Sequence, residues 1–138
     1  MISFSLPFPP SSNTYYRSIR MGNSCRVLLS KKGREYKKIV DEKIQALFLG
    51  SPGNFFPMQG RLECCIWLFP PNRRKFDIDN RIKPILDALQ DSKVYEDDEA
   101  IDVLQVQRRE IYKDGLVRIR LACLDEEGQP MIRIPDED

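Results

Sequence analysis

The chain has 138 residues, 41% of them hydrophobic and 31% charged, which is ordinary composition for one compact globular domain. Histidine is absent, which excludes Ser-His-Asp triads, histidine acid–base catalysis, Cys/His zinc sites and HEXXH metalloproteases. No apolar run approaches the roughly 18 to 20 residues that cross a bilayer, and residues 1–13 lack the basic and apolar regions of a secretory signal. We therefore expect a cytoplasmic protein that does not associate with membranes.

Strand patterns dominate the first thirty residues. Apolar–polar alternation over residues 2–8 predicts a strand, which the following PPSSN sequence ends. Residues 14–23 have the composition of a polar, aromatic and basic loop, and residues 25–29 predict a short strand.

Two helices are predicted by apolar periodicity. Ser30 is a candidate N-cap for a helix over about 31–49, and a second helix is predicted over about 80–91. The apolar residues at helical spacing are Tyr36, Val40, Ile44 and Leu47 in the first helix, and Ile82, Ile85, Leu86 and Leu89 in the second.

The remaining strands lie between and after these helices. A loop rich in glycine and proline, residues 50–60, precedes a buried strand over 61–69. Residues 101–112 and 116–124 predict a hairpin around a Lys-Asp-Gly turn. The order β-β-α-β-α-β-β favours an α/β (α+β) fold with a mixed sheet and two principal helices.

We expect one domain over residues 1–124, followed by an acidic tail, residues 125–138, that is partly disordered. The cysteines are Cys25, Cys64, Cys65 and Cys123, and without a CxxC pair or a secretory signal we expect free thiols.

The net charge of +1 hides an uneven distribution. Residues 1–83 hold 15 Lys and Arg against 6 Asp and Glu, a net charge of +9, whereas residues 84–138 hold 7 against 15, a net charge of −8. A basic half followed by an acidic half is typical of a protein with a phosphate-binding surface beside an acidic metal-binding pocket. An ordinary domain with an acidic tail explains the same numbers equally well.

The most informative segment is RRKFDIDNRIKPILDALQDSKVYEDDE, residues 73–99. Asp77 and Asp79 are two residues apart in extended chain, so their carboxylates can point the same way. Lys83 follows Asp79 by four residues and Asp87 follows Lys83 by four, which puts these three on one helical face. The acidic sequence at 96–99 lies close enough behind this helix to fold back towards its start.

Convergent carboxylates repel one another, and a hard cation with oxygen ligands such as Mg²⁺ resolves that repulsion. Such an ion lowers the pKa of a bound water and neutralises charge at a phosphodiester. Lys83 would then stabilise developing charge. The neighbouring basic residues that would hold a nucleic-acid backbone are Arg73, Arg74 and Lys75.

Other interpretations of this segment differ in how well they fit. Asp77 and Asp79 can simply cap a helix, and a bare DxDN favours that interpretation. An EF-hand does not fit, because Arg81 and Ile82 occupy the fifth and sixth positions of its loop. A PD-(D/E)xK nuclease fits poorly, because the strand over 61–69 offers no ExK or DxK.

DIDNRIKPILDAL followed by YEDDEAID resembles the signature of the RusA family of Holliday junction resolvases, often found in prophages. The family pattern is D-x-D-N-x-x-K-x-x-x-D-A-L with an acidic pair some nine residues on, and FPPSSNTYYR resembles the family's opening. The similarity covers about residues 2–123. It implies a small homodimeric endonuclease with a mixed α/β fold that depends on Mg²⁺, with Mn²⁺ as a substitute. Such an enzyme cuts four-way DNA junctions by paired symmetric nicks in recombination and repair.

Individual residues take their roles from this resemblance. The implied metal-binding catalytic aspartates are Asp77, Asp79 and Asp98, with Lys83 as the active-site lysine. Asp97 and Asp87 are additional candidates, Asp87 in a supporting role. The candidate DNA-binding residues are Arg73, Arg74, Lys75, Arg17 and Asn13. Two residues depart from expectation: Phe76 stands where a basic residue would suit phosphate contact, and Pro84 follows Lys83 inside the predicted helix.

Two other classes of function stay open. A DNA-junction binding module of the same fold that does not cut is the first alternative, although carboxylates that repel phosphate bring no benefit to binding alone. A magnesium-dependent phosphohydrolase acting on a small nucleotide is the second, and it lacks a glycine-rich phosphate cradle. A homodimer has independent support, since two symmetric nicks require two sites related by a two-fold axis.

Overall fold

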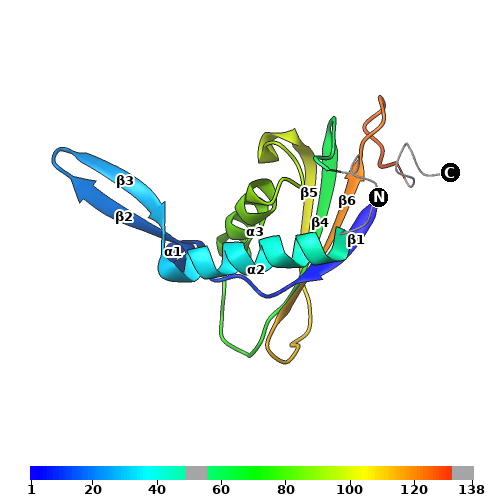
Figure 1. Ribbon diagram of the computed structural model, residues 1–138. Helices are drawn as coiled ribbons and strands as arrows, with labels where there is room; N and C mark the ends of the chain where they lie inside the picture. The colour runs from blue at the N-terminus through cyan, green and yellow to red at the C-terminus, as the bar shows by residue number, and fades with distance from the viewer. Residues whose placement is uncertain (49–55, 132–138) are drawn as a thin grey trace.

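The computed structural model describes residues 1–48 and 56–131 (Figure 1). The strands are β1 (Ile2–Leu6), β2 (Tyr16–Met21), β3 (Ser24–Leu29), β4 (Leu62–Phe69), β5 (Ile101–Arg108) and β6 (Leu116–Cys123). The helices are α1 (Ser12–Tyr15), α2 (Lys31–Phe48), α3 (Asp79–Asp91) and the 3-10 turn η1 (Asp98–Ala100). A four-stranded mixed sheet and a two-stranded one result, which confirms the predicted α+β class and its two principal helices.

The main sheet has the strand order β1-β6-β4-β5. β4 pairs in parallel with β5 on one side and antiparallel with β6 on the other. The predicted hairpin between the last two strands is therefore wrong, because β4 lies between them. The turn itself is present, with Asp114 and Gly115 at φ values of 68° and 76°, but it carries the chain across β4.

The predicted loop over residues 14–23 is also wrong. Its first residues complete the one-turn helix α1, and its remainder forms β2, which pairs antiparallel with β3 from Tyr16–Leu29 to Met21–Ser24. Gly22 makes the tight turn at a φ of 61°. Polar and basic composition concealed this strand because neither of its faces is buried. The resulting ribbon projects from the body of the protein (Figure 1).

Helix α2 begins as predicted. The hydroxyl of Ser30 accepts a hydrogen bond from the backbone N–H of Gly33 at 3.0 Å, which is N-cap geometry. Tyr36, Val40 and Ile44 are buried against the sheet. Leu47, the last residue of the predicted stripe, is 53% exposed. The final predicted residue of this helix, 49, lies outside the described residues.

Both long helices, α2 and α3, cover one face of the sheet (Figure 1). Successive side chains of β4 therefore point alternately towards the helices and towards the opposite face. Cys64, Ile66 and Leu68 point into the core beneath the helices. The fully buried side chains of Ile66 and Leu68 each stabilise the fold by roughly 1.5–3 kcal/mol. On the opposite face Trp67 is half-buried beneath the guanidinium of Arg120, whose Cζ lies 5.5 Å from the ring centroid.

All four cysteines are free, as expected. Cys64 and Cys65 are buried on opposite faces of β4, and burial raises the pKa of the Cys64 thiol to about 12. Cys25, by contrast, is exposed on the projecting ribbon.

Residues 125–131, the first part of the predicted acidic tail, make backbone hydrogen bonds. Asp125 donates its backbone N–H to the carbonyl of Gln129 at 2.8 Å, and Met131 donates to Cys123 at 2.8 Å, so the chain folds back on itself. Residues 132–138, and 49–55 of the predicted glycine- and proline-rich loop, lie outside the described residues. In the part of the chain that is described, no helix is long and apolar enough to cross a membrane.

Candidate active site

The segment between β4 and α3 contains the first of the candidate metal-binding aspartates. Asp77 and Asp79 are both exposed, and Asp79 is the first residue of α3. The residue at the N-cap is Ile78, and no side chain makes a capping hydrogen bond there. The capping interpretation of these aspartates is therefore wrong, and both carboxylates point to solvent-accessible positions at the start of the helix.

One turn further along α3, a three-residue network fixes the lysine. Lys83 Nζ donates to Asp87 Oδ1 at 3.2 Å, which confirms that their four-residue spacing places them on one face. The hydroxyl of Tyr16, at the start of β2, donates to the other oxygen of the same carboxylate. Burial, followed by this hydrogen bond to Asp87, raises the pKa of Tyr16. Asp87 thus links the lysine to the ribbon.

The acidic turn η1 brings Asp98 towards this network. The backbone N–H of Asp98 donates to Gln90 Oε1 in α3 at 2.9 Å, which ties the turn to the helix. Burial, and then the negative charge of Asp87, raise the pKa of Asp98, while the charge of Lys83 lowers it. The charges of Lys83 and Asp87 on α3 therefore act on Asp98 in η1.

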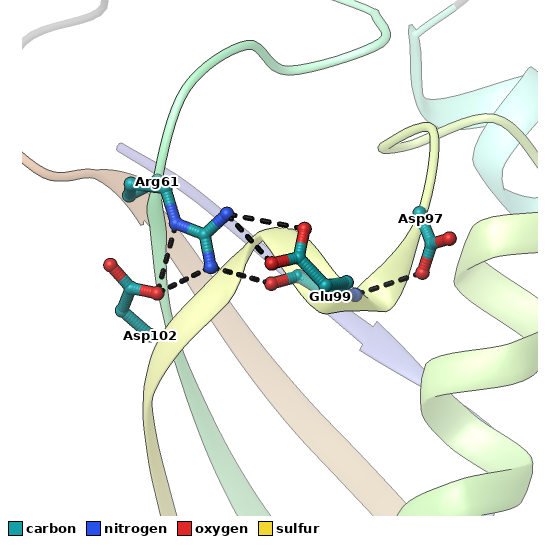
Figure 2. Close-up of polar contacts among 4 residues, drawn as sticks. All are labelled: Arg61, Asp97, Glu99 and Asp102. Carbon is teal, nitrogen blue, oxygen red and sulfur yellow. Dashed lines mark hydrogen bonds and ion pairs between the residues drawn. The ribbon is translucent and has the colours of Figure 1, made fainter.

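Asp97 has a different role from Asp98. Its Oδ1 accepts a hydrogen bond from the backbone N–H of Glu99 at 2.9 Å, so Asp97 is the N-cap of η1 (Figure 2). An oxygen occupied in this way is less available to a ligand. The geometry accordingly favours Asp98 over Asp97 as the functional member of the acidic pair.

Arg61, just before β4, holds η1 and the start of β5 in place (Figure 2). Its Nε donates to Asp102 Oδ1 at 2.9 Å, and its Nη2 donates to the backbone carbonyl of Glu99 at 2.6 Å. The Arg61 guanidinium lowers the pKa of the Asp102 carboxyl below its ordinary value. Sequence reasoning missed Arg61, since its partners are 38 and 41 residues away.

The structure brings together some of the predicted site residues and not others. Lys83 and Asp87 pair on α3 and the backbone of Asp98 is bonded to Gln90 near the end of that helix, whereas Asp79 is its first residue and Asp77 precedes it. Within residues 1–48 and 56–131, no three cysteine or acidic side chains form a group that could hold a metal ion.

A basic groove adjoins Asp77. Its lining includes the predicted DNA-binding residues Arg73, Arg74 and Lys75, joined by Arg108 and Arg109 at the end of β5. The last two were not predicted, and only the parallel pairing of β5 with β4 brings them here.

Phe76 proves to be a packing residue of this groove. Its ring meets that of Phe8 edge-on, with the centroids 5.6 Å apart. The guanidinium of Arg108 lies over the Phe76 ring at 4.6 Å and donates a 2.7 Å hydrogen bond to the Phe76 carbonyl. A basic side chain therefore reaches this position from β5, although the residue itself is aromatic.

A second groove has Lys83 among its lining residues. Asn13 and Arg17, both predicted to bind DNA, are exposed along it. The remaining lining residues are Ser12, Tyr16, Ser18, Val27 and Lys83.

Known proteins match the chain over nearly its whole length. The family model described as endodeoxyribonuclease RusA matches residues 7–122. A protein of Enterobacteria phage HK97 named crossover junction endodeoxyribonuclease rusA is 35% identical over 122 residues, 88% of this chain and 94% of the relative. Proteins named crossover junction endodeoxyribonuclease RusA from Escherichia coli O139:H28 (strain E24377A / ETEC) and Shigella sonnei (strain Ss046) are 32% and 31% identical over 125 residues, 91% of this chain and 97% of each relative.

These matches define the class as an endodeoxyribonuclease. Within that class, the chain belongs to the RusA family, as the DIDNRIKPILDAL sequence indicated.

Proposed function

We propose that this protein is a magnesium-dependent endonuclease that cuts four-way DNA junctions by paired symmetric nicks. The observation that carries the proposal is the Lys83–Asp87 pair on α3, one turn from the exposed Asp79, with the backbone of Asp98 bonded to Gln90 of the same helix. The relatives are named crossover junction endodeoxyribonucleases, which supports a DNA junction as the substrate.

The chemistry of the donor groups fits Mg²⁺, although their present placement falls short of a complete ligand set. The candidate ligands Asp77, Asp79 and Asp98 offer only oxygen atoms, as this ion prefers. Burial, and then the negative charge of Asp87, disfavour the ionised form of Asp98, a condition that a bound cation relieves. The ligand set, and Mn²⁺ as a substitute, therefore remain predictions. When bound, the ion would supply a water of lowered pKa and neutralise phosphate charge.

Lys83 and Asp87 have complementary tasks in this proposal. The Lys83 ammonium offers positive charge to a phosphate as negative charge develops there. Asp87, held by Tyr16, keeps the lysine on the groove side of α3. The basic residues that contact backbone phosphates are Arg73, Arg74, Lys75, Arg17 and, through its amide, Asn13.

Two symmetric nicks need two such sites. A homodimer with an isologous interface would present one site from each chain to strands related by the two-fold axis of the junction. We include this dimer in the proposal.

A junction-binding protein that does not cut is the second candidate. The observation that favours it is the separation of Asp77 and Asp79 from Asp98, since no three carboxylates group together in the part of the chain that is described.

A cleavage assay separates the two candidates. The full chain is mixed with a synthetic four-way junction or a matched linear duplex, in Mg²⁺, Mn²⁺ or EDTA. Paired nicks in the junction alone that require the metal support the proposal. Tight junction binding without nicks in either metal, across several junction sequences, would favour the protein that binds without cutting.

A further inference from the structure

The β2–β3 ribbon, residues 16–29, is the most unusual surface of the molecule. It extends beyond α1, away from the main sheet (Figure 1). Six residues per strand give it a reach of roughly 17–20 Å. A two-stranded ribbon is marginally stable alone in water, so a surface that covers this one would stabilise it.

The charge of the ribbon is positive throughout. Arg17, Arg20 and Arg26 lie on it, and the first acidic residue of the chain is Glu35. In the described parts of the chain, none of these three arginines takes part in an ion pair. The ribbon therefore presents three unneutralised guanidinium groups to its surroundings.

The base of the ribbon is continuous with the candidate active site. Val27 and Ser18, which are cross-strand partners, line the same groove as Lys83. Tyr16, the first residue of β2, bonds to the carboxylate that holds this lysine. A long ligand that lies across Lys83 would therefore continue along the ribbon.

The apolar side chains of the ribbon raise the question of a protein partner. Val27 is 63% exposed and Met21 is 57% exposed. The ribbon of a second copy would bring three more arginines against these three, and like charges at such distances repel. DNA fits both properties, because phosphates match the arginines while sugars and base edges offer apolar contacts.

We propose that the β2–β3 ribbon is a DNA-binding arm that holds the duplex beyond the cutting site. Arg20 and Arg26 contact backbone phosphates, and Val27 and Met21 lie against sugars and base edges. The inference rests on the proposed function, since it takes the ligand across Lys83 to be DNA, and it adds a binding surface outside the predicted DNA-binding residues.

The salt dependence of binding tests the arginines. The affinity for a fluorescent four-way junction is measured in EDTA over a range of salt concentrations, for the wild type and for Arg20→Ala with Arg26→Ala. Each lost phosphate contact should reduce the slope of log K against log salt by about 0.9, so the double variant should lose nearly two units. A matched double variant, Lys43→Ala with Arg118→Ala, removes the same charge from α2 and the open sheet face and should lose much less.

Cys25 offers a second, independent readout. It is exposed, free, and the cross-strand partner of Arg20. Saturating junction DNA should slow alkylation of Cys25 by a maleimide severalfold, with peptide mapping to separate it from Cys123. Equal alkylation rates with and without bound junction would overturn the proposal.

The outcomes distinguish this proposal from the function on which it rests. If the wild type binds junctions but the arginine variant keeps the full salt slope, the ribbon does not bind DNA, and the proposed nuclease function is unaffected. If the variant instead changes only the sedimentation of the free protein, a second copy covers the ribbon and the proposal fails. If the slopes of log K against log salt differ as expected but the wild type never cuts, the DNA-binding role of the ribbon is supported and the proposed nuclease function is wrong. A wild type that binds no DNA contradicts both.

Discussion

Ser12 donates its hydroxyl hydrogen to the carbonyl of Asn80 at 3.1 Å, across 68 residues of sequence. This carbonyl is the one that Pro84 leaves without a helical donor, because proline has no N–H to offer four residues later. Helix α3 therefore runs through Pro84 from Asp79 to Asp91. The proline that looked like an irregularity beside Lys83 is accommodated by the N-terminal segment, which is thereby attached to the first turn of the site.

The Ser12–Asn80 contact should be energetically coupled to Pro84. Ser12→Ala should lower the free energy of unfolding by about 1 kcal/mol, because the Asn80 carbonyl loses its donor. In a Pro84→Ala background the new backbone N–H can serve Asn80, so the same Ser12→Ala change should cost about half as much or less. Urea denaturation of the four proteins measures the coupling, and equal costs in both backgrounds would contradict it.

Asp98 should reduce stability at neutral pH when no metal is present. Its raised pKa means that the folded protein binds its proton more tightly than the unfolded chain does, so the stabilising contribution is present at acid pH and is lost as the pH rises through the folded pKa. Asp98→Asn should therefore raise the Tm at pH 7 in EDTA by about 1–2 °C. The difference should vanish below about pH 3, where the carboxyl is protonated in both states.

Asp97 supplies the matched control for that comparison. Asp97→Ala removes the N-cap of η1 and should lower the Tm at pH 7. If Asp98→Asn lowered the Tm as Asp97→Ala does, the repulsion inferred around Asp98 would be absent.

Arg61 should affect the rate of cutting and leave DNA binding intact. Arg61→Ala frees η1 and the start of β5, so Asp98 loses its fixed position, and the single-turnover rate should fall about tenfold or more. Junction affinity should stay within about twofold, because Arg61 lines neither basic groove. Arg61→Lys, which can keep one of the contacts, should recover part of the rate. A drop in affinity with an unchanged rate would refute this role.

Tyr16 should act through Asp87 on the lysine. Tyr16→Phe leaves the Asp87 carboxylate held by Lys83 alone, so the single-turnover rate should fall by about three- to tenfold. Tyr36→Phe is the control, since it removes a 2.9 Å hydrogen bond to the Pro7 carbonyl that involves neither Asp87 nor Lys83. That variant should lower the Tm and leave the rate unchanged, and equal rates for both variants would exclude the positioning role of Tyr16.

Local patterns predicted the parts of the site that lie on one element. The four-residue spacing of Asp79, Lys83 and Asp87 specifies a helical face wherever the helix forms, and Ser30 caps α2 by the same kind of local rule.

Contacts that depend on the pairing of strands in the sheet could not be predicted from the spacing of residues along the sequence. Arg108 joins the groove, and Arg61 reaches Glu99, only because β5 lies parallel beside β4. Strand β2 escaped prediction for another reason: none of its residues is buried on either face, so the apolar alternation that reveals a half-buried strand is absent.

Asp79→Asn in a junction-cleavage assay with parallel binding measurements tests the assigned site most directly. Cutting in Mg²⁺ should fall by about a hundredfold or more, while junction affinity stays equal or increases because a negative charge near phosphate is removed. Asp41→Asn in α2 makes the same chemical change away from the site and should cut normally. Cutting by Asp79→Asn at the rate of the wild type would contradict the assignment of the site.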